Sequence, residues 1–386
     1  MEASVYPFRT PELVYLGVGA LAKLGPEASR LRARRALIVT DRGVAGAGIA
    51  EEAKGVLARS GVEANVYDAT RAEPDFENVD DCLEVARAAD VDLLVGLGGG
   101  SSLDLAKGVA AMLTNPGRLL DYYGVDKLPN PALPIIAIPT TAGTGSEATP
   151  NAIFTDHAEK LKKGIVSPYI LPRVAIVDPA LTLTTPQRVT AATGMDALTH
   201  AVESYTSRKA TPQSEIYSLE AIRRIGASLR TAVFDGANLG ARTEMAIGSF
   251  FAGVAIANAG TGAVHAMAYP LGGQFGVTHG VSNSLLMPYV LAENMLGDLG
   301  KFGVVAAALS EPISGLSPRA AAERAVESIR QLGIDVEVPQ RMREVGVPRE
   351  AIPGMAAAAV QITRLMNNNP RRLSQSDVER IYETAW

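Results

Sequence analysis

Three of the four histidines in this chain, together with one aspartate, have the types and spacing of a metal site. Asp196 and His200 are four residues apart, so on a helix they project from one face. His265 and His279 could complete a set of one carboxylate and three imidazoles. Such donors suit Fe²⁺ or Zn²⁺ better than Ca²⁺ or Mg²⁺. The alternative interpretation is two helices that each bury a hydrogen-bonded histidine.

A glycine-rich turn, residues 96–107, follows a predicted strand and opens a predicted helix. Glycines let backbone N–H groups approach a phosphate, and a helix N-terminus adds partial positive charge and free donors. The turn departs from the Rossmann fingerprint, because Ser101 stands at its last glycine position and the candidate carboxylate, Asp41, precedes it. We therefore expect a phosphate-binding turn of another topology, with a purely structural turn as the alternative.

A second loop, residues 139–147, also follows a predicted strand and is rich in hydroxyls and glycines. This composition suits a loop that wraps a sugar and a diphosphate. Taken alone, the loop could equally be an ordinary turn. Two such loops at strand ends of one sheet make a nucleotide site the better interpretation.

The order of elements predicts an α/β half. Short apolar runs predict strands at residues 36–40, 61–67, 91–97, 134–138 and 174–177, with helices between several of them, for example at 79–89 and 102–113. Continuous apolar strands separated by helices indicate a parallel sheet covered on both faces.

The pattern becomes helical after Thr185, which precedes a proline as an N-cap does. Further helices are expected after Thr211, at 238–259, and after Ser374, where Asp377 forms a capping-box pattern. We therefore predict two domains: an α/β domain, residues 1–185, and an all-helical domain, residues 186–386, which contains the whole metal set.

Composition narrows the functional class. The 386 residues carry a net charge of −5 and no strongly basic block, which argues against nucleic acid as the main partner. Cys82 is the sole cysteine, so an intrachain disulfide framework is excluded. The start of the chain lacks a signal-peptide pattern, and no apolar stretch resembles a membrane span. We therefore expect a cytoplasmic protein without a membrane partner.

With these motifs in view, the chain resembles the iron-containing (group III) alcohol dehydrogenases over nearly its whole length. Gly98-Gly-Gly-Ser-Ser-Leu-Asp104-Leu-Ala-Lys107 and Pro139-Thr-Thr-Ala-Gly143-Thr-Gly-Ser-Glu147 are similar to the two cofactor loops of that family. Gly194-Met-Asp196-Ala-Leu-Thr-His200-Ala-Val-Glu203 and the His265…His279-Gly280 pair are similar to its metal helices.

The resemblance implies a Rossmann-like α/β domain followed by an all-α domain, in the dehydroquinate synthase-like fold. It implies a homodimeric, NAD-dependent alcohol dehydrogenase with a metal at the domain cleft, held by Asp196, His200, His265 and His279. Four protein ligands require an expandable shell to take a substrate oxygen, which favours Fe²⁺ over tetrahedral Zn²⁺, although another divalent ion is possible. A candidate dimer contact is an edge strand near Val5–Phe8.

The resemblance also implies which residues contact NAD. Asp41 would bind the adenosine ribose, and because its carboxylate repels a 2′-phosphate, NAD is favoured over NADP. Lys162 would approach the cofactor from the far side, although its lysine neighbours leave the register open, and Asp41 could instead cap a turn. The remaining candidates lie in the two loops: Gly98, Gly99, Gly100, Ser101, Ser102, Asp104, Thr140, Thr141, Thr144 and Ser146.

One departure from the family concerns the substrate. Many members carry a second histidine four residues after the third ligand, where this chain has Tyr269, which could donate a hydrogen bond, relay a proton or simply pack. Asn151, Phe154 and Phe251 are candidate pocket residues, with core packing as the alternative for both phenylalanines. Few basic residues flank the ligands, so we expect a small uncharged alcohol or aldehyde.

Other functions on this fold remain open. A dehydroquinate synthase-like lyase would need several basic residues near the metal, and a maleylacetate-type reductase would not need the metal set. A hydroxyacid–oxoacid transhydrogenase, in which two substrates recycle bound NAD, is compatible with the sequence. The non-enzyme alternative is a nucleotide-binding sensor with a structural metal. A metal-dependent alcohol dehydrogenase, in which the ion activates the alcohol oxygen and NAD accepts the hydride, is the preferred interpretation.

Overall fold

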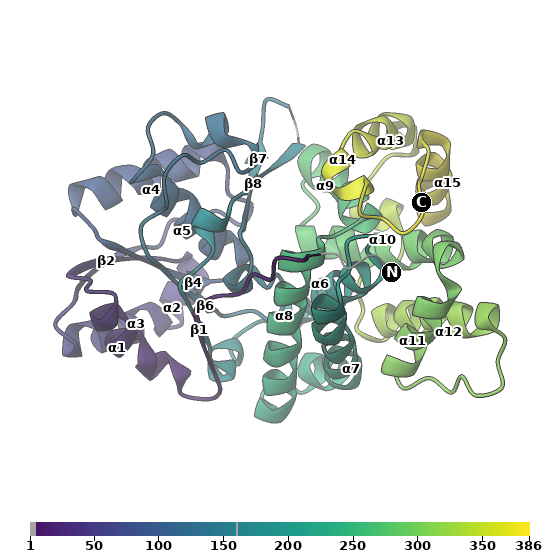
Figure 1. Ribbon diagram of the computed structural model, residues 1–386, viewed down its shortest axis with the longest axis horizontal. Coiled ribbons are helices and arrows are strands. Elements are labelled where there is room, and N and C mark those ends of the chain that lie inside the picture. The colour runs from purple at the N-terminus through teal and green to yellow at the C-terminus, as the bar shows by residue number, and fades with distance from the viewer. Residues whose placement is uncertain (1–4, 160) are drawn as a thin grey trace. The chain divides into compact units, whose positions relative to one another are not determined.

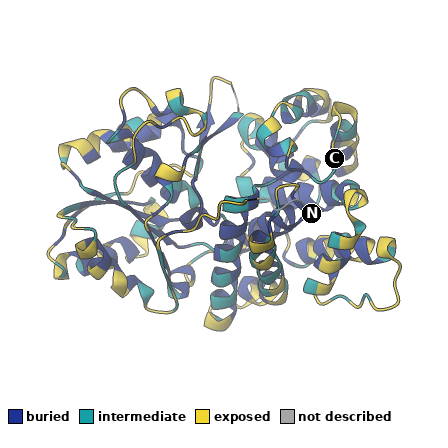
Figure 2. Ribbon diagram, in the orientation of Figure 1, coloured by how far each residue is buried: buried dark blue, intermediate teal, exposed yellow. Residues whose placement is uncertain are grey.

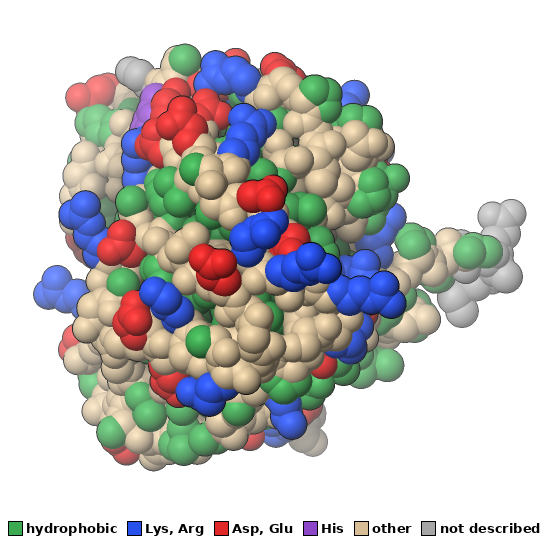
Figure 3. All heavy atoms as spheres, turned by 90° about the vertical axis from the view of Figure 1, so that its left-hand side faces the viewer, with side chains coloured by type: hydrophobic (Ala, Val, Ile, Leu, Met, Phe, Trp, Pro, Cys, Tyr) green, Lys and Arg blue, Asp and Glu red, His purple; other side chains and the backbone are tan. Residues whose placement is uncertain are grey.

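The computed structural model describes residues 5–159 and 161–386 (Figure 1). The chain divides into two compact units. One, the α/β unit, comprises residues 10–185, and the other, the helical unit, comprises 186–386 together with the described residues 5–9. On the face drawn in Figure 3, basic and acidic side chains are interspersed rather than gathered by sign.

The α/β unit is built on a six-stranded parallel sheet in the order β1-β9-β6-β4-β2-β3. Its strands are β1 (Leu13–Leu16), β2 (Arg35–Val39), β3 (Glu63–Tyr67), β4 (Leu93–Gly98), β6 (Ile135–Pro139) and β9 (Val174–Val177). The register sets Ile38 beside Val95 and Val95 beside Ile136. The five predicted strands are present with ends within two residues, and β1 at the sheet edge was not predicted.

Helices cover both faces of this sheet, as the apolar strands predicted. They are α1 (Leu24–Arg30), α2 (Arg42–Gly46), α3 (Ile49–Arg59), α4 (Phe76–Ala88) and α5 (Gly100–Met112). Apolar residues of α4 and α5 form one core with the sheet, and those of α1 and α3 form a second core on the opposite face. Figure 2 shows these buried residues in dark blue between the two helical layers.

A second, smaller sheet in this unit was not predicted. It has the order β5-β8-β7, with bounds β5 (Gly124–Val125), β7 (Asn151–Asp156) and β8 (Leu161–Val166). Strand β8 carries two buried lysines, so it lacks the apolar run that revealed the other strands. Lys163 is accommodated by ion pairs with Asp156 and Glu159.

The helical unit contains ten α-helices among its described residues. They are α6 (Gln187–Thr206), α7 (Pro212–Phe234), α8 (Leu239–Ala259), α9 (Ala263–Phe275), α10 (His279–Asn294), α11 (Leu299–Ala308), α12 (Pro318–Asp335), α13 (Ile352–Val360), α14 (Thr363–Met366) and α15 (Gln375–Ala385). The parallel-sheet unit followed by helices confirms the predicted fold class.

Helix caps follow the sequence closely. The Thr211 and Ser374 side chains cap α7 and α15 through capping boxes, and Asn238 caps α8. Helix α6 begins at Gln187 with Pro186 at its N-cap, one residue later than the predicted Thr185 cap.

The prediction of an edge strand near Val5–Phe8 is wrong. Residues 5–8 form no strand, and the next backbone groups pair with a side chain instead: Arg9 N–H donates to Asn258 Oδ1 at 2.7 Å, and Asn258 Nδ2 donates to the Arg9 carbonyl at 2.8 Å. Phe8 stacks on Tyr217 of α7. These contacts hold the segment on helices rather than in a sheet.

Among residues 5–159 and 161–386, no single helix is long and apolar enough to cross a membrane. Helices α8 and α9 meet the length and composition test only as a pair, bent by 103°.

Candidate metal centre and nucleotide loops

Three helices of the helical unit bring the predicted ligands together. Asp196 and His200 lie one turn apart on α6, His265 is in the first turn of α9, and His279 is the first residue of α10. The Asp196 Oδ1 atom lies 4.0, 3.9 and 3.8 Å from the Nε2 atoms of the three imidazoles in chain order. The four ligand atoms all lie within 4.8 Å of one another. A tetrahedral shell of roughly 2.1 Å bonds has edges of about 3.4 Å, so modest contraction would close the set on one ion.

Two of the four candidate ligands, Asp196 and His200, have the protonation states that a metal requires. Asp196 is 1 % exposed and His200 is 4 % exposed. Burial opposes ionisation of Asp196, but the surrounding imidazoles and Asn283 hold the pKa of its carboxyl below the ordinary value. Burial lowers the pKa of His200 to about 4, so its imidazole is neutral at neutral pH. An ionised carboxylate beside a neutral imidazole is a ligand pair ready for a divalent cation.

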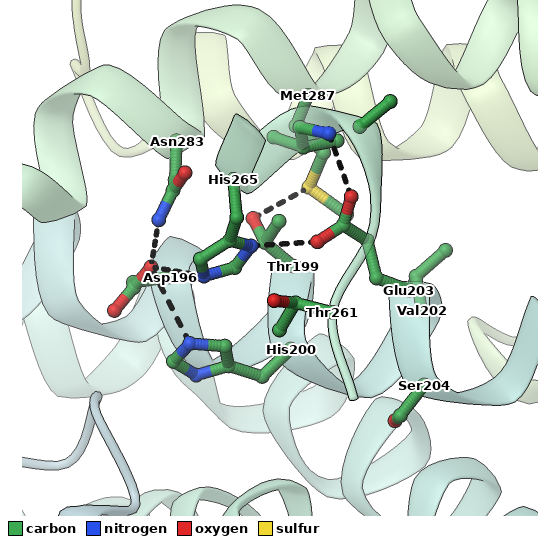
Figure 4. Close-up of polar contacts among 12 residues, drawn as sticks. Asp196, Thr199, His200, Val202, Glu203, Ser204, Thr261, His265, Asn283 and Met287 are labelled. Carbon is green, nitrogen blue, oxygen red and sulfur yellow. Dashed lines mark hydrogen bonds and ion pairs between the residues drawn. The ribbon is translucent and has the colours of Figure 1, made fainter. Parts of the chain in front are cut away.

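Glu203 fixes the tautomer of His265. Its Oε2 lies 2.6 Å from His265 Nδ1 and its Oε1 accepts a hydrogen bond from Val264 N–H at 2.7 Å (Figure 4). Because the carboxylate is an acceptor, Nδ1 carries the proton and the Nε2 lone pair faces Asp196. That buried Nε2 atom has no hydrogen-bond partner among the described residues, as expected of a metal-ligating nitrogen.

Asn283, one turn into α10, orients the carboxylate. Its Nδ2 donates to Asp196 Oδ1 at 2.6 Å and lies 3.1 Å from His279 Nε2. One buried amide therefore links the candidate ligand of α6 to that of α10. Figure 4 shows its hydrogen bond to Asp196. His279 is the most open of the four, with a side chain 31 % exposed.

Small residues let these helices approach. A Cβ on Gly280 would lie 2.8 Å from the Ala192 carbonyl oxygen, so α10 can begin against the backbone of α6 only with glycine at that position. A Cβ on Gly194 would lie 2.3 Å from Leu229, which sets the close packing of α6 on α7. These contacts explain why glycines flank the ligands in the sequence.

A remote asparagine caps the helix that carries His265. Asn369 Oδ1 accepts from Ala263 N–H at 3.2 Å, and its amide exchanges two hydrogen bonds with Asn294 at 2.6 and 2.8 Å. Asn369 therefore fixes the start of α9, the helix that carries His265.

In the α/β unit, the candidate nucleotide residues gather at one edge of the sheet. Strands β2, β4 and β6 are neighbours, and their carboxyl ends lead into Asp41, the glycine turn and the second loop. The chain passes from β2 outward to β3 and then back to β4 on the other side of β2. Such a switch point is where ligands bind in open α/β sheets.

The glycines of the first turn are required by close contacts. Gly98 has φ +151°, and a Cβ there would lie 2.7 Å from Ser102 Oγ and 3.4 Å from Asp41 Oδ2. A Cβ on Gly100 would lie 2.6 Å from Thr144 Cγ2, so the two loops touch. Thr140 N–H donates to the Gly98 carbonyl at 2.9 Å, and Thr141 lies 3.6 Å from the Cβ position of Gly99.

Several candidate cofactor residues have protein partners. Asp41 caps α2 through hydrogen bonds from Gly43 and Val44 to Oδ1, the alternative that the sequence left open. Ser101 Oγ donates to the Ala72 carbonyl at 2.5 Å, whereas the buried Ser102 Oγ has no hydrogen-bond partner among the described residues.

Lys162 also has protein partners. It pairs with Glu73 and donates to Thr155 Oγ1 at 2.9 Å, on the small sheet of the α/β unit. Asp104 and Ser146 hydrogen-bond each other, at 2.6 Å from Ser146 Oγ to Asp104 Oδ1. These contacts all lie within the α/β unit, and any contact with a cofactor stays a prediction.

The three candidate pocket residues differ in their surroundings. Phe154 is completely buried in the core of the α/β unit, where its ring packs 5.6 Å from that of Phe76, so it fits the core-packing alternative. Phe251, on α8, is half-buried with its ring edge-on to Tyr217. Asn151 is half-buried at the start of β7.

Tyr269 lies one turn beyond His265 on α9 and is 5 % exposed. Its ring packs with Ala266 and Leu365, and Arg364 Nη2 donates to its hydroxyl at 3.5 Å. The residue therefore combines packing with a polar contact to a guanidinium group distant in the sequence.

Three supporting residues were missed by sequence reasoning. Glu203 stands three residues after His200 and Asn283 four after His279, so helical spacing could have indicated both. Lys107, whose ammonium group is buried beside the second loop, shares the face of Asp104 at i+3. The acceptors of Lys107 are largely backbone carbonyls, which leave no trace in a sequence.

The protein thus joins an α/β unit with two loops at a sheet switch point to a helical unit with an aspartate–trihistidine set. The family model for iron-containing alcohol dehydrogenases matches residues 11–179, and that for the C-terminal part of the family matches residues 190–386. The chain therefore belongs to the iron-containing alcohol dehydrogenase family and is an alcohol dehydrogenase.

Individual relatives agree over the whole length. The chain is 39 % identical to 1,3-propanediol dehydrogenase of Klebsiella pneumoniae, covering 100 % of both chains, and 41 % identical to long-chain-alcohol dehydrogenase 1 of Geobacillus thermodenitrificans, covering 97 % and 95 %. A crystal structure of 1,3-propanediol oxidoreductase matches with a TM-score of 0.97 at 39 % identity, covering 99 % of this chain and 100 % of that one. Sulfoacetaldehyde reductase of Bifidobacterium kashiwanohense, solved with NAD⁺, matches with a TM-score of 0.88 at 28 % identity, covering 99 % of each.

Proposed function

We propose that this alcohol dehydrogenase interconverts small alcohols and aldehydes by hydride transfer to and from NAD, with Fe²⁺ as its metal. Zn²⁺ or another divalent ion fits the same donors. The observation that carries the proposal is the convergence of Asp196 Oδ1 with three imidazole nitrogens in a member of this family.

In the proposed reaction, the metal and NAD would supply the chemistry, and Glu203 and Asn283 would position the metal ligands. A divalent ion at these ligands supplies Lewis acidity toward the substrate oxygen, and NAD supplies the hydride acceptor. Glu203 keeps the Nε2 lone pair of His265 aimed at the metal position, and Asn283 keeps the Asp196 carboxylate turned the same way. Both contacts are internal to the helical unit, so the site is preorganised before any ligand arrives.

The choice of NAD over NADP rests on Asp41. One carboxylate oxygen caps α2, and the other lies toward Gly98 at the switch point of the sheet. A fixed negative charge there accepts ribose hydroxyls and repels a 2′-phosphate. The two loops would supply backbone N–H groups to the diphosphate, and a relative solved with NAD⁺ has the same fold.

For the substrate, we favour short primary alcohols and diols. Few basic residues flank the candidate ligands in the sequence, so phosphorylated or polyanionic substrates would have few partners there. Arg364 donates a hydrogen bond to the Tyr269 hydroxyl on α9. The relatives act on a propanediol and on long-chain alcohols, as their names state. Tyr269 would offer the substrate a hydroxyl where many family members offer a second imidazole. Dimerisation and a cytoplasmic location stay predictions.

The test is metal-dependent turnover. Metal-stripped protein is reconstituted anaerobically with Fe²⁺ or Zn²⁺, and NADH formation is followed with a panel of short alcohols and diols. We expect turnover with metal, and none in the Asp196→Ala, His265→Ala double variant. Absence of turnover with every metal and alcohol, and with aldehydes in reverse, would contradict the proposal.

The role of Asp41 has its own test. Asp41→Asn keeps the shape and the capping oxygen but removes the charge, so the ratio of kcat/KM for NADP to that for NAD should rise about tenfold or more. An unchanged ratio would remove Asp41 from cofactor selection without affecting the metal assignment.

A further inference from the structure

Lys107 is a completely buried lysine surrounded by oxygen atoms. It lies about two turns into α5, which begins at Gly100, and is 0 % exposed. Its Nζ lies 2.7 Å from both the carbonyl and the hydroxyl oxygen of Ser146, 3.0 and 3.3 Å from the corresponding atoms of Thr149, and 2.7 Å from the Asn151 carbonyl. All five acceptors belong to the segment that follows the second loop's glycines. We name this arrangement the ammonium cage.

Asp104 reinforces the cage from the same helix. Its Oδ1 accepts from Ser146 Oγ at 2.6 Å, and its Oδ2 accepts from Ile153 N–H at 2.9 Å. Asp104 also lies 3.8 Å from Lys107 Nζ, one turn earlier on α5. The two side chains together tie the segment 146–153 to one face of α5, which also carries the first loop at its N-terminus.

The same segment places the second loop on the first. Ser146 N–H donates to Thr144 Oγ1 at 3.3 Å, and Gly145 takes the left-handed conformation at φ +60°. Thr144 in turn packs so closely on Gly100 that a side chain there would clash. A chain of contacts therefore runs from Lys107 through Ser146 and Thr144 to the glycine turn.

The charge on Lys107 is costly to bury and is retained at neutral pH. Burial lowers the pKa of Lys107 to about 8, and burial likewise raises the pKa of the neighbouring Glu147 to about 7. An ammonium ion has three protons, and five oxygens lie within reach of them, so every donor is used. A buried charge that is fully hydrogen-bonded in this way is costly to remove, because its acceptors are then left unpaired.

We propose that Lys107 is a positioning residue for cofactor binding: its ammonium group holds the second loop in the shape in which both loops bind the diphosphate of NAD. This inference rests on the proposed function, since it requires that the two loops bind NAD. Lys107 acts through the loop and does not touch the cofactor, because it is enclosed and its donors are occupied. A purely structural lysine would instead affect stability without a selective effect on NADH.

The experiment removes the ammonium group and then returns it from solution. Lys107→Ala leaves space for a small cation among the five oxygens. We expect NADH binding, measured by quenching or enhancement of nicotinamide fluorescence, to weaken by about tenfold or more. The amount of bound metal and kcat at saturating NAD should stay close to wild type. Added methylammonium or ammonium chloride should restore NADH affinity, whereas tetramethylammonium chloride at equal ionic strength should not.

Lys107→Met is the matched control, because its side chain fills the space with an apolar group. It should show the same loss of NADH affinity as Lys107→Ala without restoration by methylammonium. The proposal is overturned if Lys107→Ala binds NADH as tightly as wild type, or if its kcat, metal content and thermal stability fall together with NADH affinity and methylammonium restores none of them.

A milder variant keeps the test decisive if Lys107→Ala does not fold. Thr149→Val removes one acceptor of the cage at nearly constant volume, in a residue that is not a cofactor candidate. NADH affinity should fall by about two- to fivefold with an unchanged metal content. Unchanged NADH affinity would overturn the proposal. Wild-type protein that fails to bind NADH at all would instead contradict the proposed function, so the two failures are distinct.

Discussion

Two buried polar clusters in this protein, one in each unit, differ in the source of their positive charge. In the helical unit the converging atoms are a carboxylate oxygen and three imidazole nitrogens, all able to donate electron pairs. In the α/β unit five oxygens converge on the ammonium group of Lys107, which the chain itself provides. A cluster of electron-pair donors is suited to take a cation from solution. A cluster of oxygens around a lysine is already completed by folding.

The supporting contacts of the two clusters differ in the same way. Glu203 and Asn283 hold the ligands of the metal centre from behind and leave their inner atoms directed at one point. In the ammonium cage, the Asp104 carboxylate accepts hydrogen bonds from Ser146 and Ile153. The carbonyl oxygens accept hydrogen bonds from Lys107. The first cluster is therefore arranged for binding, and the second is arranged for shape.

The largest expected effect is on metal binding in Asp196→Ala. Removing the carboxylate should weaken metal affinity by more than about a hundredfold, because the site loses its charged ligand and keeps three imidazoles. This loss exceeds the range of about tenfold to a hundredfold that is typical of residues that only support a ligand. Metal content measured by mass spectrometry checks it. Asp335→Ala, on the surface of α12 beside Arg230, is the matched control and should keep its metal. Equal metal content in the Asp196→Ala and Asp335→Ala variants would show that Asp196 is not a metal ligand.

A smaller loss is expected for Glu203→Gln. The amide cannot accept from both His265 and Val264 as the carboxylate does, so metal affinity should fall by about ten- to a hundredfold. Activity should return at high metal concentration, since the four ligands remain. Glu220→Gln, at an exposed ion pair on α7, serves as the control. An unaltered metal titration curve for Glu203→Gln would show that the contact does not support the ligand.

Asn283→Ala should have a weaker effect than either. It removes one neutral amide that donates to Asp196, and the expected loss of metal affinity is about threefold to tenfold. Competition against a fluorescent chelator would measure it. A loss as large as that of Asp196→Ala would mean that Asn283 is itself essential to the site.

The smallest expected effect is that of metal removal on NADH affinity, because the metal centre and the ammonium cage share no residue. Chelation should lower the free energy of unfolding by about 3 kcal/mol at a metal concentration a hundred times Kd. It should change NADH affinity by less than about threefold, because the ammonium cage keeps its own cation. Parallel loss of NADH binding on chelation would show that the two clusters are not independent.

Much of the fold could be predicted because the sheet strands are apolar and β-branched. Val174–Val177 was located to the residue, since it is a continuous apolar run. The small sheet was missed because β8 contains Lys162 and Lys163, whose charges are offset only by residues elsewhere in the unit. The segment at Val5–Phe8 was expected to be an edge strand, whereas it forms no strand and Phe8 packs on a helix.

The four candidate ligands could be predicted as a set from the rarity of histidine and from the helical spacing of Asp196 and His200. The spacing of Glu203 from His200 could have placed it on the same helix face, but its pairing with His265, 62 positions away, depends on how α9 packs on α6. Phe154 was a candidate pocket residue with core packing as the alternative, and its burial in the core of the α/β unit fits that alternative. Asp41 caps a helix with one oxygen, and its other oxygen lies toward Gly98, so its contact with a ribose stays a prediction.

Anomalous diffraction from crystals soaked anaerobically with Fe²⁺, and separately with Zn²⁺, would test the metal assignment most directly. We expect one strong peak in the helical unit, within about 2.3 Å of Asp196 Oδ1 and of the Nε2 atoms of His200, His265 and His279. No peak at those four atoms, or a metal bound only by other residues, would contradict that assignment.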